Sequence, residues 1–369
     1  MNVLQFICPA GFYGAEMWIL ALAKHLNPDE VRCRLAITWE SQDQNLTLFH
    51  RFRALGLPAD RFEMKGRFDF KVIGKLCQFI QDEKIDIIHT HGYKSDILGI
   101  IAAKKTGIKA VSTPHGFENS ADFKLQMFIR LGCMSLRFFD RVVPLSEALM
   151  SDILKIKVSP EKVRMIVNGV DLKEAETEIL TKNPPLYPDA GTKKVAYVGQ
   201  MASRKNIGDL IKTFDLLYQD HPDTQLFLIG EGRKKPELTA YAGSLPSSAN
   251  IAFLGYRADR LRVLKEMDLF CMTSSLEGIP RCMMEAMAMG IPVAAYNIPG
   301  VDQLILHEKT GLLADFGDYK TLKHCWERLL YDEAFAEKMA QNGRNHILEN
   351  FSAQNMAEAY TVLYQEMLN

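Results

Sequence analysis

Two glutamates with seven residues between them, Glu277 and Glu285, stand in the stretch TSSLEGIPRCMMEAMAMGIPVAA, which begins at residue 273. Pro280 is a suitable first residue for a helix, and Gly290 would end that helix. From Pro280 to Gly290 the only charged residue besides Glu285 is Arg281. The helix around Glu285 is therefore apolar on every face, and we expect it to be buried.

A buried carboxylate needs hydrogen-bond donors, because leaving it unpaired costs on the order of several kcal/mol. Ligand hydroxyl groups in a cleft would donate to Glu285, and the free N–H groups at the helix start would hold an anion beside them. Glu277, just before the helix, would face the same ligand. Alternatively, a protein arginine or lysine pairs with Glu285, and Glu277 only complements the helix dipole. The spacing alone leaves both interpretations open.

The elements that must position these acids alternate along the chain. Short apolar runs predict strands and longer segments predict helices, in the order strand 85–89, helix 96–107, strand 110–116, strand 194–199, helix near 206–219 and strand 226–230. Strands that alternate with helices predict parallel sheets covered on both faces. Such α/β units bind ligands beyond the carboxyl ends of their strands, so we expect the chemistry there.

A chain of 369 residues is long enough for two domains. The segment KNPPLYPDAGTKK (182–194) contains three prolines and is the predicted linker between domains at 1–175 and 190–350. A C-terminal helix, 352–369, is expected to pack back on the first domain. Its predicted N-cap is Ser352, and its apolar stripe consists of Met356, Tyr360, Leu363 and Met367.

The composition is that of a soluble globular protein, with 47% hydrophobic and 24% charged residues. No uncharged apolar run approaches the roughly 18 residues that a spanning helix needs. No basic leader precedes an apolar block, so we expect no signal peptide. The seven cysteines include no C-x-x-C pair, which favours reduced thiols in a cytoplasmic protein. Lysines and arginines outnumber acidic residues in residues 1–172, and acidic residues outnumber them in the remainder. A basic first half favours binding to an anionic surface such as a membrane, although unselected drift of charge along the sequence gives the same pattern.

The segment EGIPRCMMEAMAMGIPVAA resembles the signature of the family 4 retaining glycosyltransferases, which have the GT-B fold. Other segments resemble that family in order and spacing: GFYGAE (11–16), IIHTHG (87–92), STPHGF (112–117), VNGVD (167–171), VGQMASRKN (198–206), LFLIGEG (226–232) and HEKTGLL (307–313). The resemblance covers nearly the whole chain. It implies an α/β GT-B fold, with two facing Rossmann-like domains and an interdomain cleft. The first domain would bind the acceptor and the second the nucleotide sugar.

The resemblance also implies roles for residues of the second domain. Glu277 would bind hydroxyls of the transferred sugar, and Glu285 would bind the ribose, since an ionised carboxylate accepts hydrogen bonds without donating. Lys205 would hold the phosphates. Gln200 replaces the family's usual arginine, and Arg204 is the candidate to compensate for it. The alternative for Arg204 and Lys205 is a solvated helix start.

The remaining donor contacts implied by the family lie in loops. Backbone N–H groups of Gly278, Ile279, Arg281 and Cys282 would face the diphosphate, and Gly14, Gly230, Tyr256 and Pro280 complete the donor-binding set. Tyr256 would lie near the nucleobase, with a core or surface role as the alternative. The usual Pro-Glu pair of a late loop is replaced by Asp302 and Gln303.

The first domain supplies fewer candidates. At Gly14 no side chain blocks the approach of a phosphate to the backbone. His115 would contact the donor sugar and is counted as catalytic with Glu277 and Lys205. Tyr13, Glu16 and His91 would contact the acceptor. Glu16 could instead be a first-turn acid of a helix, and a lone histidine is more often structural.

These inferences predict a retaining glycosyltransferase that moves a sugar from a nucleotide-diphosphate sugar, UDP- or GDP-linked, to a glycan or lipid-linked acceptor of a surface polysaccharide or glycolipid. The chain has no D-x-D pair, so we expect no metal and no cofactor besides the donor. A non-catalytic nucleotide-sugar-binding subunit is the alternative. No G-x-G-x-x-G follows the first strand, which argues against a dinucleotide-dependent oxidoreductase. No nucleic-acid partner is expected.

The segment DFKLQMFIRLGCMSLRFFDR (122–141) combines aromatic residues with Lys124, Arg130, Arg137 and Arg141. Our hypothesis is that it lies at a membrane interface, on the inner face of the plasma membrane, where a lipid-linked acceptor would be met. A helix pair that packs on the sheet is the alternative.

Overall fold

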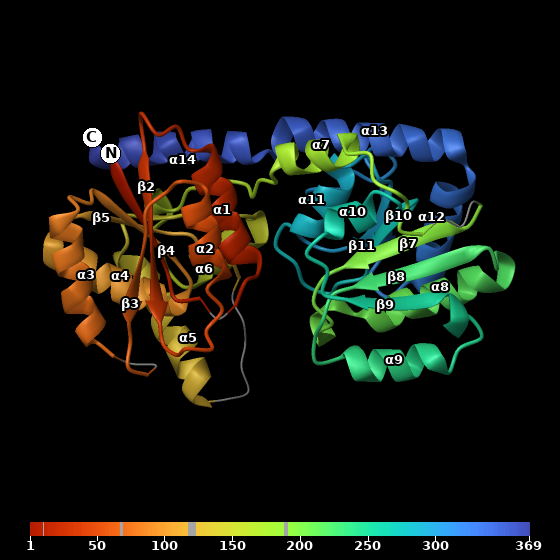
Figure 1. The fold of residues 1–369 in the computed structure, drawn as a ribbon, viewed down its shortest axis with the longest axis horizontal. Coiled ribbons are helices and arrows are strands. Elements are labelled where there is room, and N and C mark those ends of the chain that lie inside the picture. Colours follow the sequence, from red (N-terminus) through yellow and green to blue (C-terminus); the bar gives the residue numbers. More distant parts are fainter. Residues whose placement is uncertain (10, 67–68, 117–122, 188–190) are drawn as a thin grey trace. The chain divides into compact units, whose positions relative to one another are not determined.

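The computed structural model describes residues 1–9, 11–66, 69–116, 123–187 and 191–369. It forms two compact units, one made of Met1–Gly169 with Ala353–Asn369 and the other of Val170–Ser352 (Figure 1). The boundary between Gly169 and Val170 lies within the VNGVD segment, ahead of the proline-rich segment. Of the quoted segments, Phe117, Asp122 and residues 188–190 lie outside the described residues.

The first unit contains a parallel sheet with the strand order β3-β2-β1-β4-β5-β6. Its strands are β1 (Asn2–Ile7), β2 (Arg32–Trp39), β3 (Ala59–Glu63), β4 (Ile87–His91), β5 (Lys109–Ser112) and β6 (Arg141–Val142). Its helices are α1 (Gly14–His25), α2 (Thr47–Ala54), α3 (Lys71–Asp82), α4 (Tyr93–Thr106), α5 (Phe123–Ser135), α6 (Glu147–Lys155) and α14 (Ala353–Leu368).

Helix α14 completes the core on one face of this sheet, beside α1 (Figure 1). The four residues of its predicted apolar stripe are all buried, Tyr360 and Leu363 completely so. The stripe at helical spacing therefore identified the packed face of this helix correctly. On the other face of the sheet a second core forms, in which residues of α3 and α4 are buried.

The second unit repeats the same topology, with the strand order β12-β11-β10-β7-β8-β9. Its strands are β7 (Lys193–Val198), β8 (Thr224–Ile229), β9 (Ile251–Gly255), β10 (Leu269–Met272), β11 (Val293–Asn297) and β12 (Leu312–Asp315). Its helices are α7 (Leu172–Leu180), α8 (Ile207–Asp220), α9 (Lys235–Gly243), α10 (Arg260–Leu264), α11 (Arg281–Ala288), α12 (Tyr319–Tyr331) and α13 (Glu333–Asn350).

The proline-rich segment belongs structurally to the second unit. The backbone N–H groups of Leu186 and Tyr187 donate to the Glu266 carboxylate at 2.7 and 2.9 Å, and Lys194 Nζ donates to the Tyr187 carbonyl at 3.0 Å. These bonds tie the end of this segment to the second sheet, because Lys194 lies in β7.

The prediction of two α/β domains with parallel sheets is confirmed, and the differences concern element ends. The first predicted helix begins at Tyr93 rather than at residue 96. Gly92 precedes it with a φ of 104°, a left-handed conformation that lets the chain turn directly from β4 into α4. Strand β5 ends at Ser112, before the predicted end at residue 116. In the described part of the chain, no helix is both long and apolar enough to cross a bilayer.

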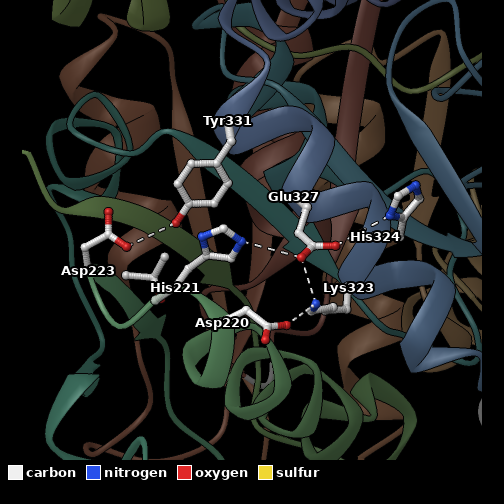
Figure 2. A network of polar contacts seen from close by, with 8 residues as sticks. Asp220, His221, Asp223, Lys323, His324, Glu327 and Tyr331 are labelled. Carbon is white, nitrogen blue, oxygen red and sulfur yellow. Dashed lines mark hydrogen bonds and ion pairs between the residues drawn. The ribbon is translucent and has the colours of Figure 1, made fainter.

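A polar network fixes α12 against the end of α8 and the turn into β8 (Figure 2). The Glu327 carboxylate lies between three cationic or ionisable groups: Lys323 Nζ at 2.7 Å, His221 Nε2 at 3.5 Å and His324 Nδ1 at 3.5 Å. Lys323 also pairs with Asp220 at 2.6 Å, and the His221 ring stacks on Tyr331 with centroids 4.1 Å apart. The network lies outside the loops that carry the candidate site.

Candidate functional site

The candidate residues of the second unit gather at one edge of its sheet. They stand in the loops that follow four neighbouring strands: Lys205 after β7, Gly230 after β8, Tyr256 after β9 and Glu277 after β10. All carboxyl ends of a parallel sheet face the same edge, so these loops share one surface. The chain runs outward in opposite directions from β7 and β10, and the gap between them is the topological switch point where α/β sheets bind ligands.

Lys205 and Glu277 form an ion pair at this switch point, between Nζ and Oε1. Both side chains are almost fully shielded, with 9% and 8% of their surface exposed. Arg204 Nη1 approaches Glu277 Oε2 at 3.5 Å, and the Arg204 side chain is 43% exposed. The shielded ion pair therefore excludes, for Lys205, the alternative of a solvated residue at a helix start. Arg204 keeps an exposed charge beside the same carboxylate. Gln200 is exposed as well.

Hydrogen bonds to backbone carbonyl groups hold the two loops together. The Ser275 N–H donates to the Arg204 carbonyl at 2.8 Å, and the Thr273 hydroxyl donates to the Asn206 carbonyl at 3.0 Å. Asn206 has a φ of 46°, so the chain turns there from a short 3₁₀ turn into α8. The ion pair thus rests on a fixed backbone frame rather than on two free side chains.

Glu285 lies in α11, which begins after Pro280 and is buried from Met283 to Ala288 as expected. Its carboxylate accepts two hydrogen bonds from Arg260, Nε to Oε2 at 2.9 Å and Nη2 to Oε1 at 2.6 Å. Arg281 Nε adds a third to Oε1 at 2.7 Å. The protein-arginine alternative thus describes the structure, and the predicted ribose contact is not tested by it.

Burial alone would raise the pKa of Glu285, but the charges and hydrogen bonds of Arg281 and Arg260 outweigh burial and hold the pKa below its ordinary value. The carboxylate is therefore ionised at neutral pH. Cys282 lies near both acids: burial chiefly raises the pKa of its thiol to about 12, and the charges of Lys205, Glu277 and Glu285 all reach it. The ion pairs of Glu277 and Glu285 are therefore neighbours around Cys282.

Two glycines of this edge are required by close backbone contacts. Gly230 has a φ of 139°, and a Cβ there would lie 1.9 Å from the Gly199 carbonyl oxygen. Gly300 has a φ of 90°, and a Cβ there would lie 1.6 Å from the Gly278 carbonyl oxygen. Gly300 also donates its N–H to Asp302 at 2.9 Å, so the late loop and the Glu277 loop pack backbone to backbone. Tyr256 is 67% exposed and stands free of this packing.

In the first unit, the candidates lie at the corresponding edge, around the switch point between β1 and β4. Tyr13 precedes α1 and is 54% exposed, and the next residue, Gly14, has open space where a Cβ would stand. Glu16 is buried and accepts the Tyr13 N–H at 2.9 Å, as a first-turn acid does. Burial raises the pKa of Glu16 against the effect of this hydrogen bond.

His91 and His115 come together at the ends of β4 and β5. His91 Nδ1 lies 3.3 Å from His115 Nε2, and His91 Nε2 lies 2.8 Å from Gln5 Oε1. Both ring nitrogens of His91 are therefore engaged within the protein. These contacts fit the alternative interpretation, in which His91 has a structural role. Burial lowers the pKa of His115 to about 4, so its ring is neutral at physiological pH.

Residues that the sequence analysis did not single out complete both edges. Arg260 holds Glu285, and Gln5, Trp18 and Tyr364 surround the histidines. Gln5 had a visible signal, because it is a polar residue inside the apolar run VLQFI. Arg260 had none, since nothing local relates it to an acid 25 positions away.

Asp96 is also new. It is 2% exposed in the first turn of α4, and its Oδ1 accepts hydrogen bonds from Thr90 on β4 at 2.5 Å and Ser112 on β5 at 2.8 Å. Burial raises the pKa of Asp96 to about 7 despite these two bonds.

Two family models match this chain: Glycosyltransferase Family 4 over residues 12–174 and Glycosyl transferases group 1 over residues 181–346. Between them they span most of both units, and the chain belongs to these glycosyltransferases. It is a glycosyltransferase, an enzyme of the class that builds polysaccharides and glycoconjugates.

Curated relatives cover most of the chain. It is 28% identical over 312 residues to the UDP-Gal:alpha-D-GlcNAc-diphosphoundecaprenol alpha-1,3-galactosyltransferase of Escherichia coli, covering 81% of this chain and 80% of that protein. It is 24% identical over 308 residues to the N-acetyl-alpha-D-glucosaminyl L-malate synthase of Bacillus anthracis, covering 82% and 80%.

Among solved structures, the chain is similar to Anabaena HepE in complex with UDP, with a TM-score of 0.83 at 20% identity over 99% of this chain and 100% of that one. The HepE complex with UDP-glucose gives a TM-score of 0.82. These likenesses show the GT-B fold, and the prediction of that fold is confirmed.

Proposed function

We propose that the chain is a retaining glycosyltransferase that moves a sugar from a nucleotide-diphosphate sugar to a glycan or lipid-linked acceptor in the biosynthesis of a surface polysaccharide or glycolipid. The observation that carries the proposal is the Lys205–Glu277 ion pair at the switch point of the second sheet, with Arg204 beside the same carboxylate. An activated sugar brings a diphosphate for the cations and hydroxyl groups for the carboxylate, so one ligand satisfies the whole arrangement.

A uridine nucleotide is the proposed carrier of the sugar. The Escherichia coli relative is named for UDP-Gal, and HepE was solved with UDP and with UDP-glucose. The same relative is named for an acceptor linked to diphosphoundecaprenol, which supports a lipid-linked acceptor here.

Lys205 and Arg204 would stabilise the charge that develops on the leaving diphosphate, the main demand when a sugar–phosphate bond breaks. Preorganised donors at a developing anion are worth roughly 10²–10³ in rate each. With two cations in place, the reaction we propose needs no metal. Retention would follow from a front-face displacement, in which the acceptor attacks on the side that the diphosphate leaves.

Glu277 would bind hydroxyls of the transferred sugar and Glu285 the ribose. An ionised carboxylate can accept about four hydrogen bonds, and Arg260 and Arg281 use three of them at Glu285. One acceptor position is left for a ribose hydroxyl. In the first unit, exposed Gly14 at the start of α1 would let a donor phosphate approach the backbone, and the exposed Tyr13 would contact the acceptor.

We also propose that the enzyme works at the cytoplasmic face of a membrane and contacts it through α5. Four large apolar side chains of α5 and of the short 3₁₀ turn that follows it are 51–62% exposed and follow each other at helical spacing: Met127, Leu131, Met134 and Phe138. Exposed Arg130 and Arg137 accompany them, as in helices that lie on anionic lipid. Liposome flotation of wild type against an Arg130→Ala/Arg137→Ala double variant tests this contact, and equal recovery of both proteins contradicts it.

A thermal-shift panel of UDP, GDP and their sugars tests the donor, because a ligand that binds only the folded state raises the melting temperature. We expect UDP-sugars to give the largest shift. Glu277→Gln should retain the shift with free UDP and lose sugar transfer, since the carboxylate would touch only the sugar. Loss of UDP binding in Glu277→Gln would contradict the assigned role.

The alternative, a non-catalytic nucleotide-sugar-binding subunit, is supported by two departures from the family pattern: Gln200 replaces the usual arginine, and Tyr13 replaces the glycine that usually precedes Gly14. Donor hydrolysis, or transfer to a lipid extract, separates the two functions. Binding without turnover across acceptors would favour the subunit.

A further inference from the structure

A continuous chain of hydrogen bonds runs through the first unit from His115 to Tyr360. Its links, in order, are His115 to His91 at 3.3 Å, His91 to Gln5 at 2.8 Å, Gln5 to Tyr364 at 3.3 Å, Tyr364 to His89 at 2.7 Å, His89 to Thr113 at 2.8 Å and Thr113 to Tyr360 at 2.8 Å. All of these residues except His115 are buried, with 0–3% of their surface exposed. The chain therefore connects a residue of the ligand-facing edge to helix α14.

Gln5 sets the direction of this chain, because an amide oxygen only accepts and an amide nitrogen only donates. Its Oε1 faces His91 Nε2, so His91 must carry a proton on Nε2. Burial, together with the neighbouring His89 and His115, holds the pKa of His91 well below its ordinary value, so His91 has no second ring proton. Its Nδ1 can then only accept, and His115 must donate from Nε2.

The other half of the chain agrees with this direction. Gln5 Nε2 donates to the Tyr364 hydroxyl, which is thereby free to donate to His89 Nδ1. His89 then carries its proton on Nε2 and donates to Thr113. Trp18 packs against the rings of His89, His91 and His115, with centroids 5.2–5.7 Å apart, and fixes their planes.

We propose that Gln5 is a positioning residue that fixes the tautomer of His115, so that His115 presents an unprotonated Nδ1 to the ligand as a hydrogen-bond acceptor. No described residue occupies that Nδ1. The proposal rests on the proposed function in one respect, that the ligand is the sugar donor. A neutral acceptor at this point selects for a sugar hydroxyl and brings no positive charge.

The tautomers can be read directly from ¹⁵N-histidine-labelled full-length protein by long-range ¹H–¹⁵N NMR, because protonated and unprotonated ring nitrogens have well-separated ¹⁵N shifts. Loss of signals in His115→Gln assigns the His115 ring. We expect the His115 proton on Nε2 at neutral pH. A His115 proton on Nδ1, or a doubly protonated ring, overturns the proposal.

Two substitutions at position 5 form a matched pair. Gln5→Met removes the acceptor, so His91 should move its proton to Nδ1 and His115 should move its proton from Nε2 to Nδ1. Gln5→Glu keeps an acceptor facing His91, so the His115 tautomer should stay as in wild type. An unchanged His115 in Gln5→Met would show that Gln5 does not set the tautomer, and if that variant fails to fold, the wild-type spectrum still decides the question.

Tyr364→Phe is the control for a purely structural effect. It removes the partner of His89 Nδ1 and leaves the His91–Gln5 bond, so His89 signals should move and His115 signals should not. A His115 tautomer that changes as much in Tyr364→Phe as in Gln5→Met would contradict the assigned role of Gln5. These spectra need no turnover, so a failure of the proposed function, seen as no nucleotide-sugar binding, is distinguishable from a failure of this proposal.

Discussion

Each of the two glutamates has its own pair of cations, and the two pairs differ in burial. Glu277 binds Lys205 and an Arg204 whose side chain is 43% exposed. Glu285 binds Arg260 and Arg281, whose side chains are only 17% and 15% exposed. A ligand can therefore compete with Arg204 for Glu277 more readily than with either arginine for Glu285, whereas the shielded Lys205 is costly to unpair.

We predict that Glu285→Gln destabilises the second unit by about 3 kcal/mol, because two buried arginines then lose their counter-charge. The Glu285 pKa is held low, so its contribution is present above the ordinary glutamate pKa and is lost as the pH falls through the lowered value. Urea denaturation at pH 7 measures the loss. Glu174→Gln is the control: its carboxylate is 49% exposed and 3.9 Å from Arg281, so it should cost less than about 1 kcal/mol.

Arg204 should matter for turnover more than for folding. If it replaces the arginine that is missing at Gln200, Arg204→Ala should lower kcat by roughly 10²-fold, as loss of one preorganised donor does. The melting temperature of the Arg204→Ala variant should stay near that of wild type, because the Arg204 side chain is exposed. Kinetics with a UDP-sugar measure this, and a Gln200→Arg/Arg204→Ala double variant should recover part of the activity. A fully active Arg204→Ala enzyme would remove Arg204 from the site.

Asp96 should make the stability of the first unit depend on pH. Its folded pKa of about 7 lies above the ordinary value of roughly 3.9, so its contribution is full below about pH 4 and is lost as the pH rises to about 7. Three pKa units correspond to at most about 4 kcal/mol. Asp96→Asn keeps an acceptor for Thr90 and Ser112 and avoids this loss, so its melting temperature relative to wild type should rise between pH 5 and pH 8.

Asp69 provides a control of opposite sign. Its carboxylate accepts the N–H groups of Lys65 and Lys71, which lower its pKa. The contribution of Asp69 is therefore complete above the ordinary aspartate pKa and is lost only in acid, so the melting temperature of Asp69→Asn relative to wild type should not rise between pH 5 and pH 8. If Asp96→Asn and Asp69→Asn followed the same trend, the Asp96 ionisation would not be the cause.

At the scale of elements, the alternation of apolar runs was sufficient to predict helices and strands, but not their ends. The start of α4 depends on the left-handed Gly92, and a glycine can adopt several conformations that a sequence does not distinguish. The pairing of α10 with α11 through Arg260 and Glu285 was also out of reach, because it joins two short helices after different strands. The apolar stripe of α14, by contrast, needed only local spacing.

The network in Figure 2 should contribute modestly to the docking of α12. Glu327→Gln removes the carboxylate that lies between Lys323, His221 and His324, and the Glu327 side chain is 26% exposed. Because exposed pairs are weak, we expect a loss of about 0.5–1 kcal/mol. Burial opposes the lowered Glu327 pKa, and Lys323 is the main cause of the lowering, so the contribution is lost as the pH falls through that lowered value.

The salt dependence separates charge from packing in this network. Guanidinium is ionic, so urea unfolding at low salt and at about 1 M NaCl is the suitable measurement. The difference between wild type and Glu327→Gln should shrink at high salt. A difference that is independent of salt would mean that Glu327 acts through packing and not through its charge.

At the scale of the whole molecule, both sheets share one topology, in which the chain starts at a central strand and builds outward in two directions. The sequence predicted two such units because the alternation restarts after the proline-rich segment. It did not predict that the boundary precedes α7, because Arg281 and Glu174 approach only in the folded unit. The prediction of function depended mainly on the family resemblance. Glu277 and Glu285 alone left two interpretations open, in which the buried carboxylate binds either a ligand or a protein arginine.

Assignment of the nucleotide to the second unit predicts where UDP alone protects the backbone. Hydrogen exchange measured by mass spectrometry on the full chain should slow in peptides that cover 199–206, 230–232 and 277–285, which follow β7, β8 and β10. At a UDP concentration of 100 times Kd the folded second unit gains about 2.7 kcal/mol, which also slows exchange that requires its global opening. Peptides of β1 to β3 should change little, because their unit holds none of the proposed nucleotide contacts except Gly14. Glu285→Gln is the matched variant, and it should reduce the protection without abolishing it, since Lys205 still holds the diphosphate. Protection confined to residues 1–169 would place the nucleotide in the first unit instead of the second. It would remove the basis for the proposed roles of Lys205, Glu277 and Glu285 together.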